Sequence, residues 1–196
     1  MKLKIKSKFG EYTVQNINKL KINKNKNYFY LIDDKLKAII LKKKITKNTI
    51  LLKASENQKS FFELGKIINK LIKLNIKKNS TIIAIGGGIT QDIAGFISSI
   101  LFRGIKWQFY PTTVLSQGDS CIGSKTSINF KDIKNQLGNF YPPSKIFIYN
   151  NFIKHLKKKD IYSGLGELLH YFLISNTKDW KFYKINLKKY LINNNK

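Results

Sequence analysis

The chain has 196 residues, 42% of them hydrophobic, and a formal net charge of +26 from 37 Lys and Arg against 11 Asp and Glu. This apolar fraction is enough for a packed core, so wholesale disorder is excluded. The one cysteine, Cys121, excludes a disulfide framework and a zinc site made of cysteines alone.

The charge itself is a weak guide to a partner. A large positive charge usually points to nucleic acid or an anionic membrane, yet only Arg103 among the 37 basic residues is arginine. Lysine, asparagine and isoleucine are all abundant and share A/T-rich codons, so we attribute the charge to genome composition. We therefore expect no nucleic-acid partner.

The first third of the chain predicts strands and one helix. Residues 3–14 alternate apolar with polar residues around a glycine, which predicts a hairpin. Residues 28–32 predict a strand ending in a turn, and residues 45–52 another strand. Apolar residues at spacings of three and four predict an amphipathic helix from residue 61 to about residue 75.

The middle of the chain predicts a parallel sheet. The expected elements are a buried strand at 81–85, a glycine turn at 86–88, a helix at 91–101, strands at 107–110 and 146–148, and helical structure from residue 160. Strands alternating with helices indicate an α/β fold with a Rossmann-like parallel sheet and crossover helices.

Neither secretion nor membrane insertion is expected. Residues 1–9 alternate basic and apolar residues and lack the apolar core of a signal peptide. The longest apolar stretch, residues 81–102, contains three successive glycines, Gln91 and Asp92, so it does not fit a membrane span. We expect a soluble cytoplasmic protein with no membrane partner.

The glycine turn at 86–88 is the first candidate for chemistry. Glycines let the backbone approach a pyrophosphate, and the helix that follows supplies unpaired N–H groups and a positive dipole end. Asp92 lies in the first turns of that helix. The spacing differs from G-x-G-x-x-G, so a nucleotide site and a purely structural turn both remain open.

A second candidate is the segment from 111 to 135, which we take as a loop. Small residues separate its polar side chains, which include Asp119, Ser120, Lys125, Thr126, Asn129, Lys134 and Asn135. Such a loop can present several donors to an anionic ligand. The alternative is a polar surface loop in a lysine-rich protein.

A third candidate is the pair Glu167 and His170. The two lie three residues apart, on one face of a helix, and could supply two metal ligands. Such a pair is also a common coincidence. The only other histidine is His155, so the chain cannot build a three-histidine site.

Together these segments resemble the ordered motifs of the 3-dehydroquinate synthase family, from about residue 55 to residue 173. The matching segments are 86–96, 103–104, 111–113, 119–126, 134–135 and 163–167, with Glu56 and Lys59 upstream. The resemblance implies an NAD-dependent and metal-dependent cyclase, with zinc or cobalt as the metal. Its reaction would convert 3-deoxy-arabino-heptulosonate 7-phosphate to 3-dehydroquinate and phosphate, in the shikimate pathway of aromatic amino acid biosynthesis.

The resemblance also implies roles for individual residues. NAD contacts are implied at Asp33, Glu56, Lys59, Gly87, Gly88, Asp92, Thr112, Thr113 and Lys134. Catalytic or substrate contacts are implied at Lys125, Asp119, Asn135, Arg103 and His170, with Glu167 as the first metal ligand. Arg103 would reach the substrate phosphate, across the interface of a homodimer when the protein is complete.

Several positions depart from the family. His170 stands where the synthases have a substrate-binding lysine, Gln91 and Ser124 each replace a glycine, and His155 replaces a threonine. The family's helical C-terminal domain brings two histidine ligands, and this chain ends soon after that domain begins.

We therefore expect an NAD-binding α/β domain at 1–158 and an incomplete start of a helical metal and substrate domain at 159–196. The alternatives are a related cyclase acting on another sugar phosphate, such as sedoheptulose 7-phosphate, and a noncatalytic NAD-binding remnant.

Overall fold

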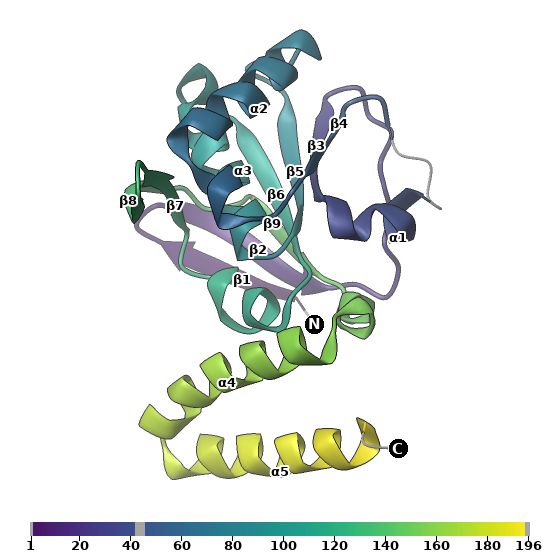
Figure 1. The fold of residues 1–196 in the computed structure, drawn as a ribbon, viewed down its shortest axis with the longest axis vertical. Helices are drawn as coiled ribbons and strands as arrows, with labels where there is room; N and C mark the ends of the chain where they lie inside the picture. Colours follow the sequence, from purple (N-terminus) through teal and green to yellow (C-terminus); the bar gives the residue numbers. More distant parts are fainter. Residues whose placement is uncertain (1, 42–45, 195–196) are drawn as a thin grey trace.

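The structure is a computed structural model that describes residues 2–41 and 46–194. Figure 1 shows an α/β part above a pair of long C-terminal helices, and we call this α/β part, formed by the sheets and the helices packed on them, the body. The strands are β1 (Lys2–Ser7), β2 (Gly10–Asn16), β3 (Tyr28–Asp33), β4 (Thr49–Leu52), β5 (Thr81–Gly86), β6 (Lys106–Pro111), β7 (Lys125–Phe130), β8 (Ile133–Phe140) and β9 (Lys145–Ile148). The helices are α1 (Lys37–Leu41), α2 (Phe61–Lys73), α3 (Gly88–Ile100), α4 (Lys158–Ile174) and α5 (Thr177–Asn194).

The main sheet has the order β1-β2-β9-β6-β5-β3-β4. Its strands pair in parallel, except that β1 pairs antiparallel with β2 at one edge. Every residue of the central strand β5 is buried, as expected for a parallel strand covered on both faces. The expected Rossmann-like α/β fold is therefore confirmed.

Alternate side chains of the strands enter two separate cores. On one face, Leu31, Ala84 and Phe109 pack under α2 and α3. On the other face, Ile32 and Ile85 pack against α1 and the segments around it. This two-sided burial fixes the register of the strands, because a slip of one residue would exchange the two faces.

Most of the expected elements are confirmed, with changes at their ends. The hairpin forms with Leu3 opposite Val14. The strand expected at 45–52 begins only at Thr49, and Ile45 lies outside the described residues. The helix expected from Gln91 begins three residues earlier, at Gly88.

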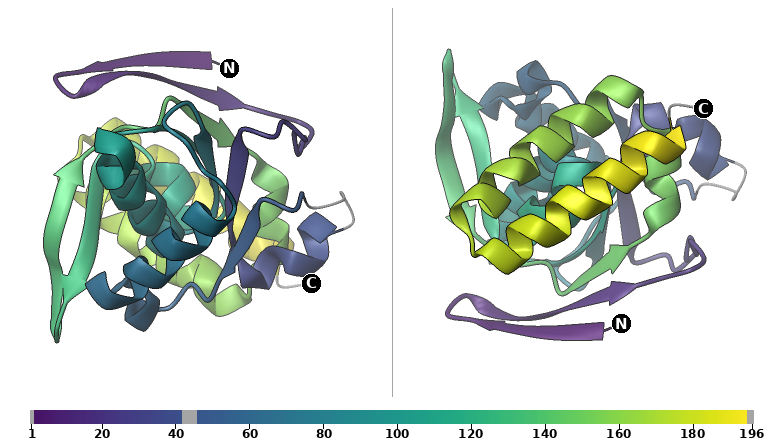
Figure 2. Two further views of the ribbon diagram at one scale, coloured as in Figure 1. Left: turned by 90° about the horizontal axis from the view of Figure 1, so that it is seen from above. Right: turned by 90° about the horizontal axis from the view of Figure 1, so that it is seen from below.

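The expectation of a loop at 111–135 is wrong for its second half. Residues 125–140 form the antiparallel hairpin β7–β8, which stands along one side of the molecule beside α3 (Figure 2). The close approach explains Gly95 of α3, because a Cβ there would lie 2.4 Å from Thr126 Cγ2. Apart from Leu137, every residue of β8 is exposed, so the strand lacks the alternation that reveals most strands.

The two C-terminal helices form a hairpin under the body (Figure 2). Helix α4 approaches the segment after β6 closely at Gly164, where a Cβ would lie 2.7 Å from Val114 Cβ. Tyr183 of α5 donates a hydrogen bond to the Leu165 carbonyl of α4 at 2.6 Å. Among the described residues, no helix has both the length and the apolar character needed to cross a membrane.

Candidate functional site

The site begins at the turn between β5 and α3. A Cβ at Gly86 would lie 2.3 Å from Thr90 Oγ1, so the turn closes only with glycine there. The Thr112 amide at the end of β6 donates to the Gly86 carbonyl at 3.0 Å and fixes the neighbouring strand. The local geometry is therefore a tight strand-to-helix turn at the carboxyl edge of the sheet, where ligands bind in open α/β folds.

Gly87 and Gly88 give this turn the features of an anion site. Gly87 is the N-cap of α3 and provides no side-chain hydrogen bond to the helix. A Cβ at Gly87 would lie 2.9 Å from Thr113 Cγ2, whereas one at Gly88 would enter open space. The helix N-terminus thus presents backbone N–H groups beside an open approach, which fits the diphosphate of a dinucleotide.

A buried ion pair lies beside this turn. Lys59 is only 6% exposed, and its Nζ lies 2.7 Å from Asp92 Oδ2 on α3. The same Nζ donates to Asn135 Oδ1 at 2.7 Å. Asp92 also accepts the Ser127 backbone N–H at 3.0 Å. Burial raises the pKa of the Asp92 carboxyl, while the Lys59 ammonium opposes that rise.

The Asn129 side chain is hydrogen-bonded to residues of the same group. Its Nδ2 donates to the Glu56 carboxylate at 3.0 Å and to the Glu56 carbonyl at 3.3 Å. Its Oδ1 accepts the backbone N–H of Asn135 at 3.0 Å. Asn135 has a φ of 58°, a left-handed conformation that this bond helps to hold. One amide therefore connects the expected NAD residue Glu56 to the expected substrate residue Asn135.

The structure thus brings Glu56, Lys59, Asp92 and Asn135 into one hydrogen-bonded group. Ser127 and Asn129 complete it; Ser127 was not singled out from the sequence, and Asn129 was named only as one of the polar side chains of the segment 111–135. Residues 126, 128 and 129 of β7 are buried, so burial does not strictly alternate there, and the sequence offers no clear signal that places Ser127 and Asn129 on a strand. The two connect the segment before α2, helix α3 and strand β8 by hydrogen bonds.

Asp33 and Thr113 lie at the same edge of the sheet. Ile32 pairs with Ile85, so Asp33, the last residue of β3, lies level with the start of the glycine turn. Its Oδ1 accepts the Lys35 N–H at 3.1 Å, and burial raises the pKa of the carboxyl. Thr113 forms short hydrogen bonds with Ser116, which hold the start of the next turn.

Asp119 and Lys125, two of the expected substrate residues, lie on the segment after β6, together with Lys134, which was expected to contact NAD. Asp119 lies on a π-helical turn at Ser116–Ser120, and it accepts a hydrogen bond from the Tyr171 hydroxyl of α4 at 3.2 Å. The nearby Asp119 charge raises the pKa of Tyr171. Lys125 begins β7 and Lys134 lies on β8, both exposed.

Arg103 does not join these residues within one chain. It lies just beyond α3, and a 13-residue helix spans about 20 Å, which separates Arg103 from Gly88. Its φ is 58°, and Lys78 Nζ holds the turn by donating to the Phe102 carbonyl at 2.7 Å and the Gly104 carbonyl at 2.6 Å.

The described residues do not make a metal site. Glu167 and His170 lie on α4, both exposed. Within residues 2–41 and 46–194, no group of three or more His, Cys, Asp or Glu side chains could hold an ion. Two ligands on one helix face are too few for a tightly held zinc.

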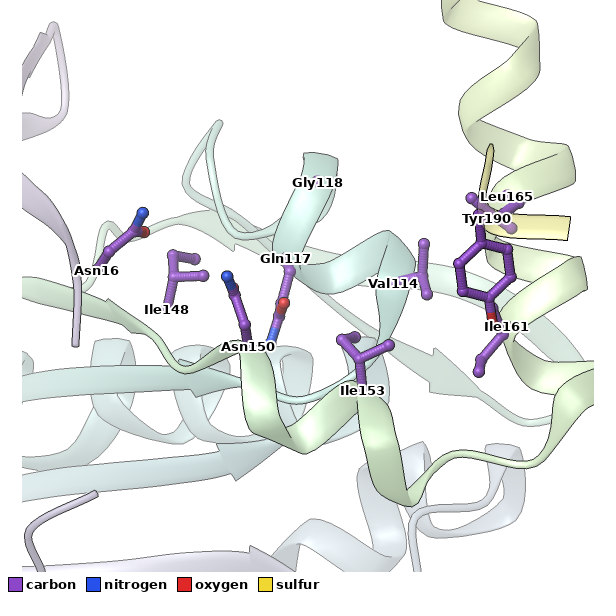
Figure 3. A pocket seen from close by; sticks show the side chains of 10 residues that line it. All are labelled: Asn16, Val114, Gln117, Gly118, Ile148, Asn150, Ile153, Ile161, Leu165 and Tyr190. Atoms are coloured by element: carbon purple, nitrogen blue, oxygen red, sulfur yellow. The ribbon is translucent and has the colours of Figure 1, made fainter. Parts of the chain in front are cut away.

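A cavity of about 450 Å³ lies between the body and the two C-terminal helices (Figure 3). Its lining is mostly apolar, with Val114, Ile148 and Ile153 from the body and Leu165 and Tyr190 from the helices. None of the residues expected to bind NAD or substrate lines it.

In three comparisons with known proteins, this chain is similar to 3-dehydroquinate synthases in sequence and to related synthases in fold. The model for the 3-dehydroquinate synthase N-terminal region matches residues 49–163, more than half of the chain. The chain is 37% identical over 195 residues to the 3-dehydroquinate synthase of Clostridium tetani, covering 93% of this chain and 52% of that enzyme. It is 43% identical over 136 residues to the 3-dehydroquinate synthase of Pelagibacter ubique, and the match covers 69% of this chain and 37% of that enzyme. The chain thus spans about half the length of such relatives or less.

Solved structures share the fold. A 2-deoxy-scyllo-inosose synthase, complexed with carbaglucose-6-phosphate, NAD+ and Co2+, superposes with a TM-score of 0.76 at 22% identity, over 90% of this chain and 54% of that one. The 2-epi-5-epi-valiolone synthase of Streptomyces hygroscopicus, with NAD+ and Zn2+ bound, gives a TM-score of 0.71 at 24% identity, over 85% and 49%.

Proposed function

The chain belongs to the 3-dehydroquinate synthase family, and on that premise we propose that it forms the NAD-binding part of a sugar-phosphate cyclase. The substrate would be 3-deoxy-arabino-heptulosonate 7-phosphate, and the products 3-dehydroquinate and phosphate. When bound, NAD would supply a reversible acceptor for the hydride of one carbinol C–H bond of the substrate, whose hydroxyl would lose its hydrogen as a proton. The ketone formed in between acidifies the neighbouring C–H bond, so that phosphate can leave.

The observation that carries this proposal is the buried Lys59–Asp92 pair beside the open turn at Gly88. The backbone N–H groups at the start of α3 would bind the diphosphate, as helix N-termini do. Lys59 and Asp92 would fix the position of Asn135, which faces the substrate. The cofactor and the substrate would therefore meet across one rigid network.

Other residues would serve the substrate. We propose that Asp119 and Lys125 orient the sugar phosphate, and that Arg103, which lies at the far end of α3, reaches the phosphate held by a second copy in a homodimer. Glu167 would supply one metal ligand. The described residues do not complete a metal site around it.

One observation favours a second substrate. His170 stands on α4 beside Tyr171, whose hydroxyl reaches Asp119, at the position where synthases have a substrate-binding lysine. An imidazole has a shorter reach than a lysine side chain and presents ring nitrogens in place of an ammonium group. A related sugar phosphate, such as sedoheptulose 7-phosphate, is therefore the second candidate.

Calorimetric titration of the full chain with NAD+ tests cofactor binding. We expect saturable binding at one site for each chain; the absence of binding heat would contradict the proposal. Salt-dependent binding of DNA in place of NAD+ would instead favour a nucleic-acid partner.

Phosphate release tests turnover. The remaining half of the relatives' length would be supplied as a separate polypeptide, and the two sugar phosphates compared. Release from the first substrate supports the leading proposal, and release from sedoheptulose 7-phosphate alone supports the second. NAD+ binding without either reaction would identify a noncatalytic NAD-binding module.

A further inference from the structure

Gln91 lies in the first turns of α3 and makes a buried contact that a glycine could not make. The residue is 5% exposed. Its Nε2 donates to the Ser120 carbonyl at 2.5 Å, and the Ser120 hydroxyl donates to Gln91 Oε1 at 3.0 Å. Both ends of the side-chain amide are therefore used by one residue, 29 positions away in the sequence.

This contact joins two parts of the candidate site. The backbone N–H of Gln91 donates to the Gly87 carbonyl at 3.0 Å, so Gln91 is bonded to the glycine turn by its main chain. Its side chain reaches the residue that follows Asp119. Asp119 in turn accepts the Tyr171 hydroxyl of α4. A continuous path of hydrogen bonds and one peptide link thus runs from the glycine turn to α4.

The segment that Gln91 holds needs such an anchor. Residues Ser116–Ser120 form a π-helical turn, a form that is rare in proteins and occurs mostly as single turns. Hydrogen bonds between Thr113 and Ser116 fix its start. Near its end, the Gln91 amide fixes Ser120 against α3.

We propose that Gln91 is a positioning residue that locks the Asp119 turn onto α3 and couples it to the glycine turn. A glycine at this position would have no side chain to reach Ser120. The inference rests on the proposed function in one respect, namely that the glycine turn holds NAD and Asp119 faces the substrate. The lock itself depends only on the contacts.

Amide hydrogen exchange in the full chain tests the lock. Gln91→Met keeps the length of the side chain and removes both hydrogen bonds. We expect exchange across residues 116–122 to become about tenfold faster, as for the loss of a buried hydrogen bond, while β5 and α2 keep their protection. Gln108→Met on β6 makes the same chemical change elsewhere and should leave this segment unchanged.

Variants of Ser120 provide a second test in which the sequence of α3 is unchanged. Ser120→Ala removes the hydroxyl donor but keeps the carbonyl acceptor, so a smaller acceleration is expected. Ser120→Thr retains the hydroxyl and should restore the original exchange rate. Unchanged exchange in both Gln91→Met and Ser120→Ala would overturn the proposal.

Exchange with and without NAD+ tests the coupling. In the original chain, NAD+ should slow exchange across residues 116–122. In Gln91→Met, NAD+ should still bind by calorimetry but no longer slow exchange there. An equal response in the two proteins, including no response in either, overturns the coupling. If the original chain binds no NAD+, the proposed function fails, and the comparison without NAD+ still decides the lock.

Discussion

The Lys59 ammonium lies 2.7 Å from Asp92 Oδ2, and this ion pair joins the segment before α2 to the second turn of α3. The two side chains are 8% and 18% exposed, so neither charge is well hydrated. An ion pair this buried is costly to break, because removing one partner leaves the other charge without compensation.

Lys59→Met should therefore destabilise the chain. We expect the free energy of unfolding to fall by about 3 kcal/mol, because Asp92 would be left as an uncompensated buried carboxylate. Chemical denaturation measures the change. Lys66→Met is the matched control: Lys66 pairs with Glu63 on the exposed surface of α2, where such a pair contributes less than about 1 kcal/mol. Equal losses in the two variants would contradict the assignment.

The stability of Lys59→Met should also depend on pH, because the variant removes one partner of the Lys59–Asp92 pair. Burial raises the pKa of Asp92, and Lys59 opposes the rise, so Lys59→Met should raise that pKa further. A carboxyl with a raised pKa in the folded state binds its proton more tightly there than in the unfolded chain. Its effect on stability is therefore favourable at low pH and is lost as the pH rises through the folded-state pKa. The deficit of Lys59→Met should shrink on acidification, and Asp92→Asn should abolish that trend.

Asn129→Ala should weaken NAD+ binding. The change frees the Glu56 carboxylate and the Asn135 backbone, both of which Asn129 holds by hydrogen bonds. We expect a loss of about tenfold in affinity, in line with about 1 kcal/mol or more for one buried hydrogen-bonding group. Calorimetry measures it. Asn139→Ala on the exposed face of β8 is the control and should keep the original affinity.

The central parallel strands were predictable because their signal is local. Residues 82–85 form an unbroken apolar run before three glycines, and such a run followed by glycines fits few structures other than a buried strand and a turn. The amphipathic helix α2 follows from spacing alone, and its N-cap Ser60 accepts the Glu63 N–H at 3.3 Å.

The β7–β8 hairpin was not predictable in the same way. Its partner strand β8 is exposed along nearly all its length, so no burial pattern marks it in the sequence. Ser127 and Asn129 gain their roles only because this hairpin folds against α3, a contact between residues far apart in the chain. Local propensity does not predict such a contact.

Burial of the Cys121 thiol predicts that the chain loses stability at alkaline pH. The thiol is 2% exposed, and burial raises its pKa to about 11 from 9.0. Between these two values the folded state holds the proton and the unfolded state releases it, so stability should fall as the pH rises from about 9 to 11. The total loss should approach roughly 2 to 3 kcal/mol. Cys121→Ala should lose this part of the slope, and denaturant titrations across that pH range measure it. Equal slopes in both proteins would contradict the prediction.

Gly88→Ala separates cofactor binding from folding. A Cβ at Gly88 meets no atom within 4 Å, so the variant should fold and be slightly more stable, by about 0.5 kcal/mol, through a less flexible unfolded chain. The same methyl group would stand where a diphosphate approaches the start of α3, so NAD+ affinity should fall at least tenfold. Gly65→Ala on α2 also meets open space, and it should gain stability without any loss of affinity. Thermal unfolding and calorimetry of the two variants together decide the matter, because unchanged NAD+ binding in Gly88→Ala would remove the glycine turn from the cofactor site.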